Sequence, residues 1–223
     1  MGVHVAVVRV FTDAAGAYGN PLGIVSAGDV APAQRQSLAA RLGFSETVFY
    51  TVRGATADAQ IFTPAVELPF AGHPTVGLAW WLREQARPVE SLAVPAGSVA
   101  VGGDADVTLV HARPDWAPEF VFHDLDSPDA VEALDPAAFR DGHHYAWAWA
   151  DEAAGALRSR MFAPDMGVAE DEATGAAAVR ITARLGRDLT ITQGRGSQIF
   201  TRWDPAGSVE LGGRVVADPS LQV

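Results

Sequence analysis

The chain has 223 residues, of which 48% are hydrophobic and 19% are charged, and its net charge is -11. This composition is typical of a globular protein that is long enough to bury a sizeable core. The acidic balance argues against a nucleic-acid partner, and the absence of cysteine excludes disulfides, thiolate metal sites and thiol catalysis.

The first residues alternate like a strand and lack the basic and long apolar regions of a signal peptide. No apolar run reaches the length needed to cross a membrane. We therefore expect a cytoplasmic protein with no membrane partner.

The first half of the chain alternates between β-branched runs, Gly/Pro turns and two helical patterns. In chain order we expect a strand at 3–11, a Gly/Asn/Pro loop running into a strand at 16–25, a helix at 31–43, a strand pair at 46–52 and 58–63, an apolar helix from about 74 to 85, and short strands and turns over 91–114.

The second half repeats this alternation. We expect a Pro/Asp-rich loop at 113–120, a short helix or turn at 135–142, a hairpin over 143–162, an apolar helix from about 172 to 185, and closing strands over 189–203 and 208–216.

The two halves resemble each other around a strand that ends in Phe-x-Pro. Residues 61–64 read IFTP and residues 161–164 read MFAP, and each is followed within ten residues by a polar residue before an apolar helix. These residues are His73 and Asp171. The regular spacing predicts an internal duplication, with strands wrapped around one buried helix in each half.

His73 and Asp171 are expected to be the N-caps of the two apolar helices, with Pro74 at the first position of the first helix. Ordinary capping explains each residue alone. A helix start also has free N–H groups and a positive dipole end, which together bind anions such as carboxylates. If both starts face one cleft, a substrate carboxylate would bind there, with His73 and Asp171 at its rim.

Glu46 is a third candidate, because it stands between Ser45 and an apolar β-branched run. A partly buried carboxylate has a raised pKa, which suits general acid/base catalysis. An exposed glutamate at a strand entry is the alternative.

These motifs resemble the PhzF-like proteins, a phenazine-biosynthesis isomerase family with the diaminopimelate-epimerase fold. The matching segments follow the family's order over nearly the whole chain: VFTDAAGAYGNPLGIV at 10–25, SETVFY at 45–50, IFTPAVELPFAGHPTVG at 61–77, MFAPDMGVAEDEATGAAA at 161–178 and QG at 193–194.

The resemblance implies an α+β fold of two pseudo-symmetric lobes, each a barrel-like, mostly antiparallel sheet around a central helix. The lobes are expected at 1–113 and 114–223, with the active site between them and with a homodimeric assembly. Catalysis would need no cofactor or metal. Glu46 would be the general acid/base, and His73 and Asp171 would bind and polarise the substrate. The substrate-binding set would be Asn20, Gly72, Thr174, Gly175 and Ala176.

The chain departs from the family pattern in the segment E-D-P-A-T-G-S and in length. Glu172 replaces the usual Pro, and Ala176 replaces a Ser whose hydroxyl contacts substrate in the family. The segment after the QG pair is shorter, and further length is missing between residues 114 and 150. The phenazine substrate is therefore not carried over.

With one candidate base, the sequence favours a proton shift on one face of a substrate over racemisation, which needs two bases. The alternative is a non-catalytic protein that binds small anions in the same cleft. A metal enzyme built on His143 and His144 is disfavoured, because adjacent residues on a strand point to opposite faces and metal sites need convergent ligands.

Overall fold

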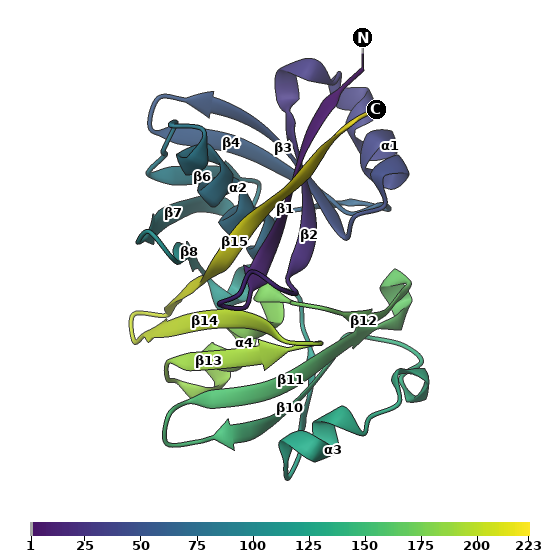
Figure 1. Ribbon diagram of the computed structural model, residues 1–223. Coiled ribbons are helices and arrows are strands. Elements are labelled where there is room, and N and C mark those ends of the chain that lie inside the picture. Colours follow the sequence, from purple (N-terminus) through teal and green to yellow (C-terminus); the bar gives the residue numbers. More distant parts are fainter. Residues whose placement is uncertain (1) are drawn as a thin grey trace.

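Apolar β-rich segments form strands around two apolar helices in the computed structural model, which describes residues 2–223 (Figure 1). The first part contains β1 (His4–Thr12), β2 (Asn20–Ser26), α1 (Pro32–Leu42), β3 (Glu46–Arg53), β4 (Thr56–Phe62), β5 (Glu67–Leu68), α2 (Gly72–Glu84), β6 (Ser91–Val94), β7 (Gly97–Gly103) and β8 (Thr108–Ala112). The second contains β9 (Val121–Asp124), α3 (Pro128–Glu132), β10 (His144–Asp151), β11 (Ala156–Ala163), β12 (Val168–Asp171), α4 (Gly175–Leu185), β13 (Leu189–Gln193), β14 (Ser197–Asp204) and β15 (Ser208–Gln222).

The first lobe is a closed barrel around α2. Its strands follow the order β1-β2-β3-β4-β6-β7-β8-β15, and β15 pairs back onto β1. Every residue of α2 from Gly72 to Ala79 is buried, because this stretch has no charged side chain that would need water. The helix therefore fills the barrel as its core.

The second lobe is a curved sheet in the order β15-β14-β13-β11-β10-β9, and it packs against α4. The buried side of α4 consists of small and β-branched residues, including Ala177, Ala178 and Ile181, whereas Arg184 lies near its end, where a cation complements the helix dipole. The fold is thus the predicted α+β arrangement of two lobes, each built around one helix.

The strand pairings confirm the internal duplication. In the first lobe β2 pairs with β3 in parallel, β3 with β4 antiparallel, and β4 with β6 in parallel across α2. In the second lobe β9 pairs with β10 in parallel, β10 with β11 antiparallel, and β11 with β13 in parallel across α4. The short strands β5 and β12 occupy matching places beside β4 and β11.

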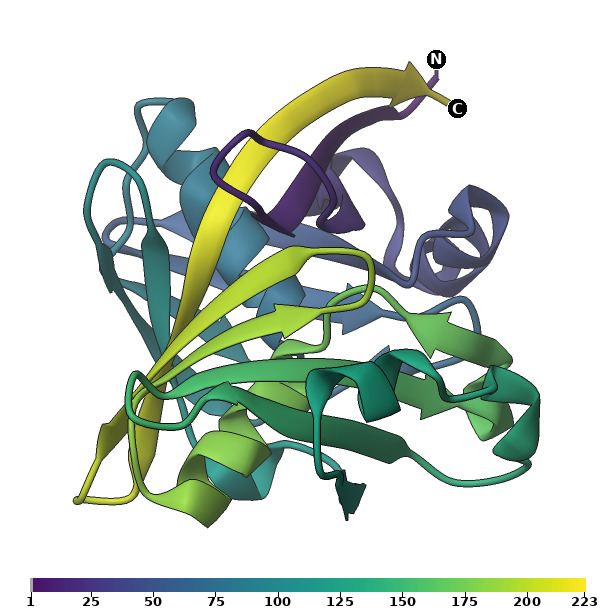
Figure 2. The same cartoon turned by 60° about the horizontal axis from the view of Figure 1, so that its bottom comes forward.

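Strand β15 joins the two lobes. Its first half lies between β14 and β8, and its second half runs along β1 to the end of the chain. Figures 1 and 2 show this long strand crossing the molecule, with both termini at the same end. The boundary between the lobes after residue 113 remains a prediction. Strand β15 pairs with strands of both lobes, so it belongs to the sheets on both sides of such a boundary.

The predicted helix starts and caps were wrong by a few residues. Helix α2 begins at Gly72 with Ala71 as its N-cap, so His73 and Pro74 lie inside the first turn. Helix α4 begins at Gly175 with Thr174 as its N-cap. Asp171 instead ends β12, where it pairs with Met161, and residues 172–174 connect that strand to the helix.

None of the helices in residues 2–223 combines the length and the apolar character required to cross a bilayer.

Candidate active site

The starts of α2 and α4 touch, and two glycines make this contact possible. A Cβ added to Gly72 would lie 3.0 Å from Cα of Gly175, and a Cβ on Gly175 would lie 3.1 Å from Cα of Gly72. Both backbones therefore approach more closely than any side chain would allow. The contact brings the positive ends of two helix dipoles to one point at the junction of the lobes.

We expect Gly72→Ala to lower the free energy of unfolding by about 1–3 kcal/mol, the usual cost of overpacking. The added methyl would lie 2.5 Å from Cδ2 of Leu211 and 3.0 Å from the backbone of Gly175. Leu211 can rotate, but the Gly175 backbone cannot yield without moving α4. Urea unfolding measures the effect. Gly102→Ala is the matched control, since no atom lies within 4 Å of the added Cβ, and equal stability of the two variants would contradict the prediction.

Glu46 and His73 meet beside this helix contact. Glu46 is the first residue of β3, where it pairs with Leu22 of β2, and His73 is in the first turn of α2. Nδ1 of His73 lies 3.2 Å from Oε2 of Glu46, and the two side chains are only 4% and 16% exposed. Within residues 2–223, neither Oε2 of Glu46 nor Nε2 of His73 has a hydrogen-bond partner. Unpaired buried polar atoms are rare and call for an explanation, such as a role in catalysis or binding.

Asp171 reaches the same cluster from the second lobe. Its Oδ1 accepts a hydrogen bond of 2.8 Å from the side-chain amide of Asn20, and its Oδ2 accepts one from the hydroxyl of Thr174. The Asn20 amide also donates to the carbonyl of Ala173 at 3.1 Å. Asn20 lies at the start of β2, so these bonds link the two lobes.

Burial dominates the electrostatics of all three titratable groups. It raises the pKa of Glu46 to about 7, against a hydrogen bond from Ser45 that lowers it. It lowers the pKa of His73 to about 4, against the charge of Asp171 and the carbonyl of Pro21. Burial and then the charge of Glu46 raise the pKa of Asp171 to about 6, against hydrogen bonds from Thr174 and Asn20 and the charge of His73.

The directions of these pKa shifts decide which of the three groups are charged at neutral pH. His73 is neutral, so its contact with Glu46 is not an ion pair despite the short distance. The raised pKa values of Glu46 and Asp171 bring both carboxyl groups to titrate closer to neutrality than ordinary carboxyl groups do. Because the two carboxyl groups interact, their titrations are coupled and belong to the pair. The cluster can therefore both hold and release a proton near pH 7.

Two further residues organise the cluster, although neither was among the predicted site residues. The buried Gln193 amide donates to the carbonyl of Asp171 at 3.0 Å and to the hydroxyl of Thr174 at 2.9 Å, while its oxygen accepts from the Thr174 N–H. Ser45 donates to Oδ1 of Asn20 at 3.2 Å. Gln193 belongs to the QG pair already matched at 193–194, so that motif was the available signal.

The α4 start carries the remaining predicted binding residues. Thr174 is the N-cap, and Gly175 and Ala176 form the first turn, whose N–H groups have no partner within the helix. Ala176 adds only a methyl group there. The backbone can thus present donors to an anion, but the side chain at 176 cannot.

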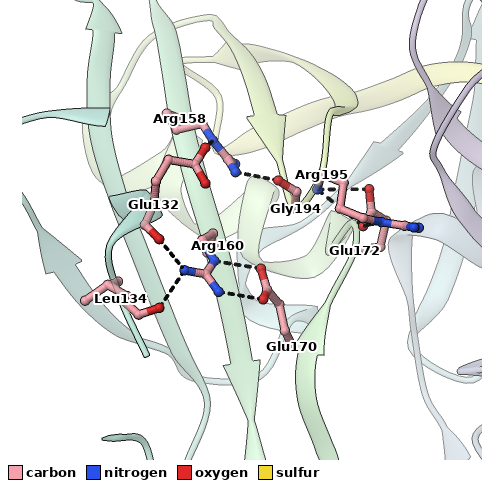
Figure 3. Close-up of a pocket in the computed structure, with 8 residues that line it drawn as sticks. All are labelled: Glu132, Leu134, Arg158, Arg160, Glu170, Glu172, Gly194 and Arg195. Atoms are coloured by element: carbon pink, nitrogen blue, oxygen red, sulfur yellow. Dashed lines mark hydrogen bonds and ion pairs between the residues drawn. The ribbon is translucent and has the colours of Figure 1, made fainter. Parts of the chain in front are cut away.

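A surface cavity of about 550 Å³ lies next to this cluster without containing it (Figure 3). Glu170 and Glu172 line the cavity, whereas Asp171 between them bonds to Asn20 and Thr174. The three arginines that line it are already paired with glutamates of the same wall: Arg158 with Glu132, Arg160 with Glu170 and Arg195 with Glu172. The volume of this cavity therefore does not mark the candidate catalytic groups. The buried polar atoms of Glu46 and His73 that lack hydrogen-bond partners in the described part of the chain mark them instead.

The adjacent histidines of the metal alternative lie elsewhere. Nδ1 of His144 is 3.0 Å from Nε2 of His123 at the far edge of the second sheet, and the ring of His143 packs near Phe120. No group of three or more His, Asp or Glu side chains within residues 2–223 is arranged to hold a metal ion.

Comparison with known proteins identifies similar chains along most of the length. The model of the PhzC-PhzF family, described as phenazine biosynthesis-like protein, matches residues 8–114 and 98–204. A trans-2,3-dihydro-3-hydroxyanthranilate isomerase of Pseudomonas fluorescens is 33% identical over 221 residues, which cover 82% of this chain and 80% of the relative. An isomerase of the same name from Pseudomonas chlororaphis is 31% identical over 236 residues, which cover 88% of this chain and 84% of the relative.

Solved structures share the fold. A crystal structure of a PhzF family phenazine biosynthesis protein from Enterococcus faecalis aligns with a TM-score of 0.82 at 20% identity, covering 100% of this chain and 99% of the other.

Proposed function

The chain belongs to the PhzC-PhzF family of phenazine biosynthesis-like proteins, whose curated relatives are named isomerases, and we propose that it moves a proton between two carbons of a small carboxylic acid. The reaction uses general acid/base catalysis by Glu46 and needs no cofactor.

The observation that carries this proposal is Glu46, a buried carboxyl group with a pKa of about 7. A group that titrates near the working pH can take a proton from one carbon and return it to another. Its Oε2 is buried beside the helix contact without a hydrogen-bond partner in residues 2–223, and we assign it to the proton of the carbon acid. Because a single such group serves this role, the shift stays on one face of the substrate.

His73 and Asp171 support the same chemistry. Neutral His73 has an unpaired buried Nε2, which can hydrogen-bond to a substrate oxygen where negative charge develops. Asp171, held by Asn20 and Thr174, binds a donor group of the substrate. The touching starts of α2 and α4 bind its carboxylate through backbone N–H groups near Gly72, Gly175 and Ala176, whereas the Thr174 N–H is already donated to Gln193.

Ala176 changes which substrate fits rather than removing the site. A single hydroxyl contact is worth about 0.5–1.5 kcal/mol net, which is too little to abolish carboxylate binding by backbone groups. The family's usual substrate contact at this position is absent, so we infer an acid with an apolar group next to Ala176.

The test is proton exchange from solvent. The purified protein is incubated in D₂O with a panel of unsaturated or carbonyl-activated acids, beginning with trans-2,3-dihydro-3-hydroxyanthranilate, the compound in the relatives' names. We expect NMR to show conversion of at least one acid with deuterium at the carbon that gains a proton, equally before and after treatment with EDTA.

Two outcomes contradict the proposal. Binding of several acids without conversion or deuterium uptake would indicate the small-anion-binding alternative. Activity that is lost in EDTA and restored by one metal would show that the reaction is not cofactor-independent. Sedimentation of the same sample tests the homodimer, which remains a prediction.

A further inference from the structure

The turn at residues 194–196, together with Ser197 at the start of β14, is packed between Glu172 and the loop that precedes β2. Oε2 of Glu172 accepts a hydrogen bond from Nε of Arg195 at 2.9 Å, and its Oε1 accepts one from the Ser197 hydroxyl at 2.9 Å. Figure 3 shows the Glu172 carboxylate against Gly194 and Arg195 at one side of the cavity. Although Glu172 is only 15% exposed, its charge is fully paired by this turn.

The contacts continue into the first lobe. The Ser197 hydroxyl, which donates to Glu172, also accepts a hydrogen bond of 2.9 Å from the N–H of Gly19. The next residue is Asn20, whose amide donates to Asp171, the neighbour of Glu172. Hydrogen bonds and chain therefore form a closed ring through Glu172, Ser197, Gly19, Asn20 and Asp171.

Two glycines show how closely the turn fits its neighbours. A Cβ on Gly194 would lie 2.9 Å from the Glu172 carboxylate, and a Cβ on Gly196 would lie 2.6 Å from the Tyr18 ring. Both glycines have positive φ angles, 59° and 152°, which other residues rarely adopt. The turn thus contacts Glu172 on one side and the loop before Asn20 on the other.

We propose that Glu172 is a positioning residue, which acts through Ser197 and Gly19 to hold the Asn20 amide on the carboxylate of Asp171. The proposal rests on the function proposed above and assigns a purpose to the glutamate that stands where the family usually has proline. A side-chain oxygen at position 172 accepts from the Ser197 hydroxyl and so turns its lone pairs toward Gly19, a role that a glutamine oxygen can also fill.

Four variants separate this role from charge and from general stability. Glu172→Ala and Ser197→Ala break the ring, whereas Glu172→Gln keeps an oxygen acceptor but removes the charge. Glu132→Gln is the matched control for loss of a carboxylate in the same cavity, because its partner Arg158 bonds to the carbonyl of Gly194 but to neither Glu172 nor Ser197. Both readouts use the free protein, so they do not depend on finding a substrate.

The first readout is hydrogen exchange of the Gly19 amide, measured by NMR. We expect exchange to be about tenfold faster in Glu172→Ala and Ser197→Ala, a change equivalent to one hydrogen bond. It should be close to wild type in Glu172→Gln and in Glu132→Gln. Unchanged exchange in Glu172→Ala would overturn the proposal, because Ser197→Ala removes the acceptor of the Gly19 N–H directly and serves as the reference for its loss.

The second readout is the pKa of Asp171, followed by ¹³C NMR of its carboxyl carbon. The Asn20 hydrogen bond lowers this pKa, so displacing Asn20 must raise it. Loss of the Glu172 charge alone should not raise it, because removal of a nearby anion can only favour ionisation. We therefore expect a higher pKa in Ser197→Ala than in wild type, and a higher pKa in Glu172→Ala than in Glu172→Gln.

Equal pKa values in Glu172→Ala and Glu172→Gln would mean that Glu172 acts only as a charge, and would reject the positioning role. Ser197→Ala keeps the charge and is the smallest change, so an unchanged pKa of Asp171 in this variant would overturn the proposal even if Glu172→Ala does not fold. If both readouts agree with the positioning role of Glu172 but no acid is converted in D₂O, only the proposed catalysis is rejected.

Discussion

Glu46→Gln is expected to slow proton transfer by about 10²–10⁴-fold, the usual contribution of a general acid/base, while carboxylate binding changes little. Glutamine keeps the shape of the side chain but cannot titrate. In the proposed complex the carboxylate is bound by helix N–H groups rather than by Glu46, so affinity should persist. The measurement is the initial rate of deuterium incorporation in D₂O for the acid that the wild-type protein converts, with affinity determined by calorimetry.

Glu119→Gln is the control for this comparison, because Glu119 makes a surface pair with Arg180 and its side chain is 89% exposed. It should retain the wild-type rate. If Glu46→Gln converts the acid at an unchanged rate with the same labelling, Glu46 does not move the proton and the mechanism is wrong.

The same substitution is expected to stabilise the folded protein at pH 8 but not at pH 4. Burial raises the pKa of Glu46 from 4.5 to about 7, so the folded wild type binds this proton more tightly than the unfolded chain. The associated stability is complete below pH 4.5 and is lost as the pH rises to about 7. A pKa increase of this size corresponds to about 3 kcal/mol of folding stability. The wild type loses this stability as the pH rises, whereas Glu46→Gln has no titrating group at this position and does not.

Neighbouring groups do not reverse the sign. The charge of Glu46 also raises the pKa of Asp171, so removing it relieves Asp171 in the same pH range. The lowered pKa of His73 destabilises both proteins as the pH falls below 6.5, and this effect largely cancels in their difference. Urea unfolding at several pH values measures that difference. A difference that stays constant from pH 4 to pH 8 would show that Glu46 is not buried as described.

The sequence by itself determined most of the elements, the duplication and the three candidate residues, but it did not predict β9, α3 or β12. Apolar runs without charge, such as residues 76–82, must be buried wherever they fold. Phe-x-Pro recurs at 62–64 and 162–164, and the pairings around β4 and β11 bear out the repeat. Local pattern was sufficient here, because periodicity and turn residues act over short stretches of chain.

Only the tertiary structure decided where the helices begin, how the barrel closes and which charges the cluster holds. Helix α2 starts at Gly72 because Gly175, more than 100 residues later, packs against it. Asp171 remains in β12 through its pairing with Met161, so it could not serve as the cap that its residue type predicted. Such contacts join residues distant in the sequence, and no local pattern records them.

The same reason applies to Glu46, Gln193 and Glu172. The raised pKa of Glu46 results from burial, which depends on His73 and the second lobe. Gln193 and Glu172 act through partners at Thr174, Ser197 and, beyond them, Gly19. Hydrogen bonds and desolvation are set by which groups meet in space, so the chemistry of the site emerges only when both lobes are folded together.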